Sequence, residues 1–312
     1  MDNAKILALY DEDERRGISF PWARREILPN VVRHVSLEEG DGFIMYSKVD
    51  EQTVDAEIEA QIAYFESQGQ GFEWKAYDYD TPPDLLQRLE ARGFEIEEEE
   101  ALLILPLDEA PANLLAPLTH DIRRITDPAG IDDVVAVERA IWDWDFGVMA
   151  DRLRADLRDQ PDILSVYVAY AGRQPVSAAW MYCPPSSRFA SMWGGSTLPD
   201  FRGRGIYTQL VAARVQEARA RGKQFLTIDA SPMSRPIVTK QGFRFIEPIR
   251  STQGASSSPK REQHESLVIK LGTFVEHVSL DVQAMNEEAI CSLGPTNERL
   301  GGLCDQAGAG SE

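Results

Sequence analysis

One segment of the sequence restricts the fold more than any other, because a strand, a loop with two glycines and a helix follow each other within residues 191–214. Residues 191–197 have the pattern of a short strand that ends in a proline turn. Gly203 and Gly205 let the loop backbone approach a ligand without a Cβ atom in the way. Their N–H groups, with those that open the helix, form a cradle for a phosphate, and Arg202 and Arg204 add positive charge. We therefore predict that this segment holds a phosphorylated cofactor.

Two common phosphate-binding motifs are absent from this loop. A P-loop needs G-x-x-x-x-G-K-S/T, which does not occur here, and the dinucleotide motif G-x-G-x-x-G fails because Thr208 stands at its third glycine. The alternative to a ligand site is an ordinary glycine turn. The surroundings favour a site, since the helix after the loop ends at Gly222 and is followed by a buried strand over 225–230, a short helix and the pair Gly242-Phe243.

This order of elements resembles motifs A and B of the GCN5-related N-acetyltransferase (GNAT) superfamily. Motif A is an Arg/Gln-x-x-Gly-x-Gly/Ala loop after a strand; Arg202 and Gly205 match it, whereas Tyr207 stands where glycine or alanine is usual. Motif B ends in the same Gly-Phe pair. The resemblance implies the mixed α/β sheet of this superfamily, acetyl-CoA as co-substrate, and direct transfer of its acetyl group to an amine.

The resemblance also implies which residues contact acetyl-CoA. The backbone at the end of the strand is expected to pair with the pantetheine arm, and the loop is expected to bind the pyrophosphate. The strand residues are Ser196, Thr197 and Leu198, and the loop residues are Arg202, Gly203, Arg204, Gly205, Ile206, Tyr207 and Thr208.

Charge is unevenly distributed along the 312 residues, whose net charge is −19. Residues 1–110 hold 27 Asp and Glu against 10 Lys and Arg, so the acidity lies in the first third, and the part with the phosphate loop is close to neutral. A chain this acidic does not show the basic surface that nucleic-acid binding requires. The sequence shows no apolar run of membrane-spanning length and no secretory signal, and its three cysteines and four histidines have no metal-ligand spacing. We expect a cytoplasmic protein that binds neither membrane nor metal.

The elements of motif B have counterparts in the N-terminal third. The earlier copy consists of a strand over 72–77, a helix opened by Thr81-Pro82, the pair Gly93-Phe94 and a strand over 101–105, and the later copy of a strand over 225–230, a helix over 232–241, Gly242-Phe243 and a strand over 266–271. The first copy has no R-x-x-G-x-G loop. We therefore predict two tandem acetyltransferase folds, of which the N-terminal one has lost its cofactor site; a chance similarity of two α/β halves is the alternative.

Composition and periodicity divide the chain into four predicted parts. They are a degenerate N-terminal domain over 1–107, a linker over 108–120, the acetyltransferase domain over 121–271 and a largely disordered tail over 272–312. Further elements are expected as helices over 54–65, 131–141, 148–157 and 282–291, and as strands over 164–170 and 175–183. A polar loop over 251–261 is expected to join the last two strands.

Acetyl transfer needs a base for the amine, a donor for the oxyanion and a proton for the departing thiolate. The superfamily's common tyrosine, four residues before the glycine of Gly-Phe, is Val238 here, and Ser231 stands where asparagine is frequent. Tyr182, on the strand over 175–183, and Asp229, near the end of the strand over 225–230, are the remaining catalytic candidates. For Asp229, a helix cap or a turn is the alternative.

Acidic and indole side chains cluster near the end of the helix over 131–141 and suit an ammonium group through charge and cation–π contact. We expect the acceptor to be bound by Glu138, Trp142 and Asp143, with Trp193 from the strand over 191–197. Core tryptophans and solvated acids are the alternative. The main hypothesis is an N-acetyltransferase for the primary amine of a small molecule. A CoA-binding sensor or scaffold without catalysis and a protein N-acetyltransferase are the alternatives, and the sequence gives no indication of the oligomeric state.

Overall fold

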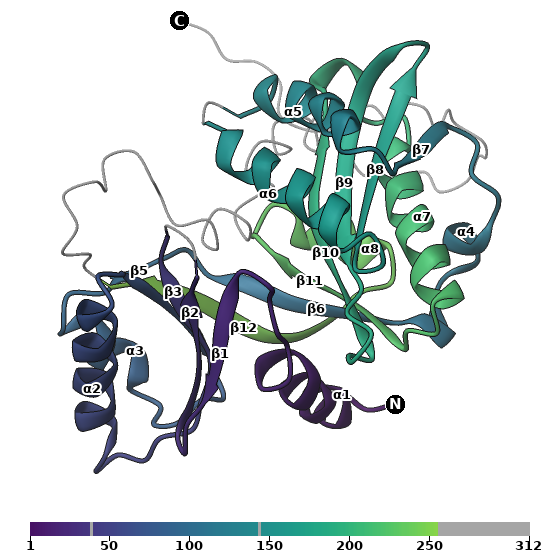
Figure 1. Cartoon of the computed structure of the whole chain (residues 1–312). Helices are drawn as coiled ribbons and strands as arrows, with labels where there is room; N and C mark the ends of the chain where they lie inside the picture. The colour runs from purple at the N-terminus through teal and green to yellow at the C-terminus, as the bar shows by residue number, and fades with distance from the viewer. Residues whose placement is uncertain (38–39, 143–144, 255–312) are drawn as a thin grey trace, which may run out of the picture. The chain divides into compact units, whose positions relative to one another are not determined.

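A single mixed sheet contains strands from both halves of the sequence (Figure 1). The computed structural model describes residues 1–37, 40–142 and 145–254. Within them the strand order is β1-β2-β3-β4-β12-β6-β11-β10-β9-β8-β7, and the short β5 lies beside β12. This arrangement confirms the predicted α/β class with a mixed sheet.

The helices and strands have the following bounds. The first half contains α1 (Asn3–Tyr10), a π-helical turn (Asp11–Arg15), β1 (Ala23–Ile27), β2 (Val31–Ser36), β3 (Gly42–Ser47), α2 (Val54–Ser67), β4 (Phe72–Tyr77), α3 (Leu85–Glu90), β5 (Glu95–Ile96) and β6 (Glu100–Pro106). The second half contains α4 (Ala112–Leu115), β7 (Asp121–Ile125), α5 (Ile131–Arg139), α6 (Gly147–Asp159), β8 (Leu164–Ala171), β9 (Gln174–Tyr182), β10 (Phe189–Thr197), α7 (Ile206–Ala220), β11 (Phe225–Ala230), α8 (Arg235–Lys240) and β12 (Arg244–Gln253). None of the helices in these ranges is long and apolar enough to cross a membrane.

The two halves follow the same plan and exchange their last strands. In each half an antiparallel meander ends in a parallel pair joined by a helix, β3 and β4 through α2, and β10 and β11 through α7. A short helix, the Gly-Phe pair and a final strand come next. The final strand of the second half, β12, pairs with β4, and that of the first half, β6, pairs with β11. Because β6 and β12 also pair with each other, they join the two halves at the centre of the sheet (Figure 1).

Helices cover both faces of the second half. Successive side chains of β9 point to opposite faces of the sheet. Ala178 and Trp180 pack with α5 and α6 on one face, whereas Ala179 and Met181 pack toward α7 on the other. In the first half, Trp74 of β4 is fully buried in the core that α2 and α3 cover. The other face of β4 carries polar side chains, which become part of the site described below.

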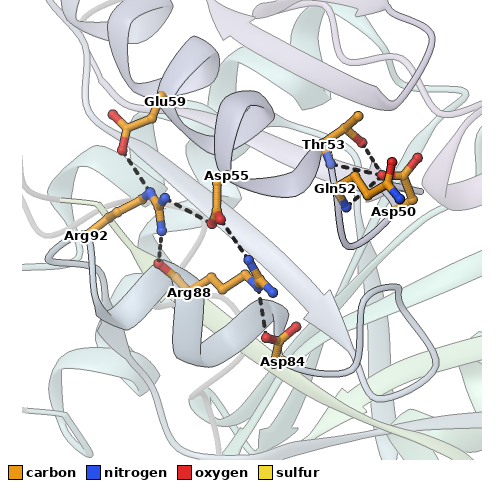
Figure 2. A network of polar contacts seen from close by, with 8 residues as sticks. All are labelled: Asp50, Gln52, Thr53, Asp55, Glu59, Asp84, Arg88 and Arg92. Carbon is orange, nitrogen blue, oxygen red and sulfur yellow. Dashed lines mark hydrogen bonds and ion pairs between the residues drawn. The ribbon is translucent and has the colours of Figure 1, made fainter.

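Ion pairs join α2 to α3 in the first half (Figure 2). Arg88 contacts Asp55 and Asp84 at 2.8 and 2.9 Å, and Arg92 contacts Asp55 and Glu59 at 3.0 and 2.8 Å. These side chains are partly exposed, so each pair contributes little stability on its own. Their shared partner, Asp55, fixes the position of α3 along α2.

The predicted first residue of one loop is wrong. Residues 251–253, expected in a polar loop, belong to β12, which starts directly after Gly242-Phe243 and pairs with β4 and β6 on its two sides. The expected strand over 266–271, the rest of that loop and the tail lie outside the described residues. In the predicted linker, Leu114 of α4 is fully buried, and Gln216 of α7 donates to its carbonyl at 3.0 Å.

Candidate active site

The two central strands of the second half separate after a short paired stretch. Residues 189–191 of β10 pair with residues 225–227 of β11, and β10 has no partner strand on that side afterwards within the described sheet. A bulge between Gly194 and Ser196 shifts the register of β10 against β9, and such bulges bend a strand. The result is an opening between β10 and β11, with backbone groups of β10 along one edge.

Two glycines at this bulge make room for aromatic rings. Gly194 and Gly195 have φ values of 63° and 123°. A Cβ atom on Gly194 would lie 2.4 Å from the Trp180 ring, and one on Gly195 would lie 2.7 Å from the ring of Tyr207. The departure from motif A at Tyr207 thus has a structural explanation, since the tyrosine ring fills the space that Gly195 leaves.

The glycine loop forms an open cradle at the start of α7. Gly203 and Gly205 have φ values of 70° and 78°, and no described heavy atom outside the chain neighbours lies within 4 Å of a Cβ built at either position. Arg202 ties this loop to the end of β10, because its Nε donates to the carbonyl of Thr197 at 3.1 Å. The N–H of Leu198 donates to the carbonyl of Val176 at 2.9 Å, and the Leu198 carbonyl accepts from the N–H of Phe201 at 2.9 Å, so the predicted pantetheine contact would be a second hydrogen bond to this carbonyl. The open space around Gly203 and Gly205 fits a pyrophosphate.

The equivalent position in the first half is closed by a carboxylate (Figure 2). Between β3 and α2, the Asp50 side chain accepts from the backbone N–H groups of Gln52 and Thr53, each at 2.9 Å, and from the Thr53 hydroxyl at 2.8 Å. An anion placed there would meet N–H groups that are already bonded and a negative charge. These contacts support the prediction that the first half lacks a cofactor site.

A cavity of about 140 Å³ lies at the opening between β10 and β11. Its lining includes Met192 and Ile228, which belong to the core under α7, and Trp193, which packs with the core under α5 and α6. The cavity therefore lies at the opening, and residues 202–208 of the glycine loop are not among the described residues that line it.

Both predicted catalytic residues line this cavity. The Tyr182 hydroxyl donates to Oδ2 of Asp156 at 2.8 Å, and burial together with this carboxylate raises the pKa of Tyr182 well above its usual value. Asp229 forms an ion pair with Lys75 of β4. Burial disfavours the Lys75 charge, but Asp229 together with Tyr77, Glu100 and Glu73 outweighs this effect and raises the pKa of Lys75. The helix-cap alternative for Asp229 is therefore not needed.

The predicted acceptor residues are divided between two places. Trp193 lines the cavity, and its Nε1 donates to Ser191 at 3.0 Å. Glu138 is fully buried behind β10, where its Oε2 accepts from the Ser196 hydroxyl at 2.8 Å, and Trp142 donates to the same hydroxyl at 3.1 Å. Neither Glu138 nor Trp142 is among the described residues that line the cavity. Asp143 lies outside the described residues.

The positions of the superfamily's common proton donor and asparagine are occupied by buried side chains. Val238 is fully buried in the core between α7 and the sheet. Ser231 is buried at the start of α8, where its hydroxyl accepts from the backbone N–H of Ser234 at 3.3 Å. Neither side chain can supply the proton that a departing thiolate needs.

Sequence reasoning missed several polar residues of the cavity. They are Glu73 and Lys75 of β4, Glu100 of β6 and Asp156 of α6. The first three come from the predicted degenerate half and reach the cavity only because β6 and β12 are exchanged, which no local pattern indicates. Asp156 could have been noticed as a candidate, because it lies on the helix that follows the acidic and indole cluster near the end of the helix over 131–141.

Comparisons with known proteins agree with this geometry. A family model described as an acetyltransferase (GNAT) domain matches residues 146–259, from the start of α6 past β12. The GCN5-related N-acetyltransferase from Kribbella flavida is 13% identical, with a TM-score of 0.60 over 81% of this chain and 95% of that chain. A conserved protein of unknown function from Staphylococcus epidermidis is 15% identical, with a TM-score of 0.58 over 79% and 97%.

A tandem GNAT protein from the clavulanic acid biosynthesis pathway is 13% identical, with a TM-score of 0.52 over 78% of this chain and 86% of that chain. At these identities the structural likeness shows the fold alone. No curated protein matches the sequence significantly. The family model and the shared fold together show that this chain carries an acetyltransferase domain of the GCN5-related N-acetyltransferase superfamily.

Proposed function

We propose that the chain transfers the acetyl group of acetyl-CoA to the primary amine of a small molecule by direct attack. The observation that carries this proposal is the cavity at the β10–β11 opening, which Tyr182, Asp229 and further acidic side chains line. A thioester lying along β10 would present its carbonyl group inside the cavity. We further propose that the enzyme acts in the cytoplasm.

The residues around the opening provide for the proton transfers that this reaction needs. The amine nitrogen attacks the thioester carbon, a C–N bond forms, and the C–S bond breaks as the thiolate leaves. The proton lost by the amine passes to the Tyr182 hydroxyl oxygen, while the Tyr182 proton moves to Asp156, which already accepts it in a hydrogen bond of 2.8 Å. The return of this proton along the same path neutralises the thiolate. Asp229 orients the ammonium form of the acceptor, which releases its extra proton to solvent before the free amine attacks.

Cofactor binding follows from the loop and the strand end. The N–H groups of residues 203–206 would hold the pyrophosphate, with Arg202 and Arg204 beside it. The backbone of Ser196 and Thr197, with the Leu198 carbonyl, would pair with the pantetheine arm. Ile206, Tyr207 and Thr208 open α7 and complete the predicted cofactor set.

A CoA-binding sensor without catalysis is the second candidate. It is favoured by Val238, which takes the place of the superfamily's common tyrosine and is fully buried. A protein N-acetyltransferase remains a third hypothesis, because a cavity of about 140 Å³ can take one extended lysine side chain as well as a small molecule.

Calorimetry with acetyl-CoA tests the cofactor site. We expect a dissociation constant in the micromolar range for the wild type and a loss of at least about 100-fold for Gly205→Glu, because the new side chain brings bulk and negative charge into the cradle. Gly172→Glu is the matched control, since Gly172 also has a positive φ, 63°, and open space around it but lies in the turn between β8 and β9. Absence of binding by the folded wild type would overturn both the enzyme and the sensor hypotheses. Thiol release with primary amines then separates these two.

A further inference from the structure

The cavity extends from the β10–β11 opening over polar side chains supplied by the first half. Asp229 and Thr227 of β11, Glu100 of β6, Ser251 of β12, and Glu73 with Lys75 of β4 all line it. These strands are consecutive in the sheet, so the exchange of β6 and β12 places the polar side chains in one row across a single face. Neighbouring strands lie about 4.8 Å apart, so Glu100 is within roughly 10 Å of the opening.

Carboxyl groups outnumber cations around the cavity, because Glu14, Glu73, Glu100, Asp156 and Asp229 line it together with the two cations Lys75 and Arg152. Lys75 is already paired with Asp229, so its charge is balanced. Glu73, Glu100 and Glu14 have no cation assigned to them among the described ion pairs, although Ser251 and Ser187 donate to Glu73 and Glu14. Burial raises the pKa of Glu73 above its usual value, that of Glu14 to about 7 and that of Glu100 to about 8. In each case burial outweighs the opposing effect of a nearby lysine, Lys75 for Glu73 and Glu100 and Lys223 for Glu14, so a further cation would stabilise the ionised form.

Three acceptor atoms in this row have no hydrogen-bond partner within the described structure. They are Oε2 of Glu73, Oε1 of Glu100 and Oγ1 of Thr227. Glu73 is 1% exposed and Thr227 is 4% exposed, so bulk water does not satisfy them. A buried acceptor without a donor costs free energy, and a ligand that brings several N–H donors removes this cost.

The chamber suits an extended organic cation better than a metal ion. No three His, Cys, Asp or Glu side chains in the described ranges come close enough to hold a metal ion. Aromatic side chains that suit an aliphatic chain also line the cavity; they are Tyr10, Phe20, Phe43 and Trp22, whose ring lies 4.7 Å from the Arg152 guanidinium.

We propose that the first half of the chain supplies the subsite that selects the acceptor, with Glu100 and Glu73 binding the second ammonium group of an aliphatic diamine while its first amine reaches the β10–β11 opening. The proposal rests on the proposed function. The distance from the opening to Glu100, roughly 10 Å, corresponds to a spacer of about four to six methylene groups.

Calorimetry with 1,4-diaminobutane, 1,6-diaminohexane and butylamine tests the subsite on the full chain. We expect the wild type to bind the diamines more tightly than butylamine. In Glu100→Gln and Glu73→Gln, the diamine dissociation constants should rise about 10- to 100-fold, while that of butylamine stays unchanged. The matched control is Glu98→Gln, an exposed carboxylate two residues before Glu100, which should leave diamine binding unchanged. Thermal unfolding verifies that each variant is folded, and glutamine preserves the shape of both buried side chains.

Two results would overturn the subsite. One is equal affinity of the wild type for the diamines and butylamine, and the other is unchanged diamine binding in both folded variants. Because calorimetry needs no turnover, this test is separate from that of the proposed function. If a diamine binds through Glu100 but is never acetylated, the proposed acetyltransferase activity is contradicted and the proposed subsite is supported. If butylamine and the diamines are acetylated at equal kcat/KM and bind equally well, the subsite is contradicted and the acetyltransferase activity is supported.

Discussion

Replacing Glu138 by glutamine tests whether the buried carboxyl group of α5 is neutral in the folded protein. The side chain is fully buried, its Oε2 accepts from Ser196 at 2.8 Å, and its Oε1 has no hydrogen-bond partner in the described part of the chain. Burial raises the pKa of Glu138 from an ordinary 4.5 to about 8, although the Ser196 hydroxyl lowers it in part. At neutral pH this group therefore keeps its proton in the folded state and loses it on unfolding.

The sign and size of the effect follow from this difference. Since the folded state binds the proton more tightly, the contribution to stability is complete below pH 4.5 and is lost as the pH rises to about 8. Each pKa unit corresponds to about 1.4 kcal/mol, so the loss is on the order of 3–5 kcal/mol. Glutamine carries no charge at any pH and can still accept from Ser196. The free energy of unfolding of Glu138→Gln should thus be close to that of the wild type at pH 5 and larger by several kcal/mol at pH 9.

Urea unfolding, followed by tryptophan fluorescence at pH 5 and pH 9, measures this difference. Other buried carboxyl groups with raised pKa values, such as Glu14 and Glu100, change both proteins equally and cancel in the comparison. A difference between variant and wild type that is the same at both pH values would refute the reasoning. If Glu138→Gln is still an active enzyme, the Glu138 carboxyl group is not the base for the acceptor amine.

Two further predictions concern the opening between β10 and β11. Gly195→Ala should destabilise the protein by about 2–4 kcal/mol, from backbone strain at a φ of 123° and a contact of 2.7 Å with the Tyr207 ring. In a Tyr207→Gly background only the strain remains, so urea unfolding should show a smaller cost, and equal costs would argue against the ring contact. Tyr182→Phe should lower kcat by about 10²- to 10⁴-fold with acetyl-CoA affinity unchanged, because the proton path to Asp156 is lost. An unchanged kcat in a steady-state thiol-release assay would remove Tyr182 from the mechanism.

Local elements of this fold were predictable because their burial is periodic. The strands β4 and β11 begin and end at the predicted residues 72–77 and 225–230, and α7 begins at Ile206 after the glycine loop. The last three residues of β12 were placed in a loop because its sequence, RFIEPIRSTQ, mixes charges with Pro248 and lacks alternation. It forms a strand because β4 and β6 flank it on both sides, a condition set by distant parts of the chain.

Some residues of the candidate site could likewise be predicted from the sequence, and others could not. The glycine cradle was predictable, since contiguous residues form it and its geometry depends on local backbone freedom. Tyr182 and Asp229 were found as polar residues on strands next to the cradle, and the cavity includes both. Glu73, Lys75 and Glu100 could not be found, because an acidic residue in a sequence gives no sign of which distant strand it will face.

The exchange of final strands explains why a half without a cofactor site is part of this protein. The strand β11, which carries Asp229, pairs with β6 along its whole length, so the second half obtains one neighbour of its central parallel pair from the first. The first half in turn obtains β12 beside β4. Loss of the phosphate cradle, where Asp50 now occupies the N–H groups before α2, leaves these pairings intact. The first half can therefore carry acidic side chains on β4 and β6, which the proposed cationic acceptor would need.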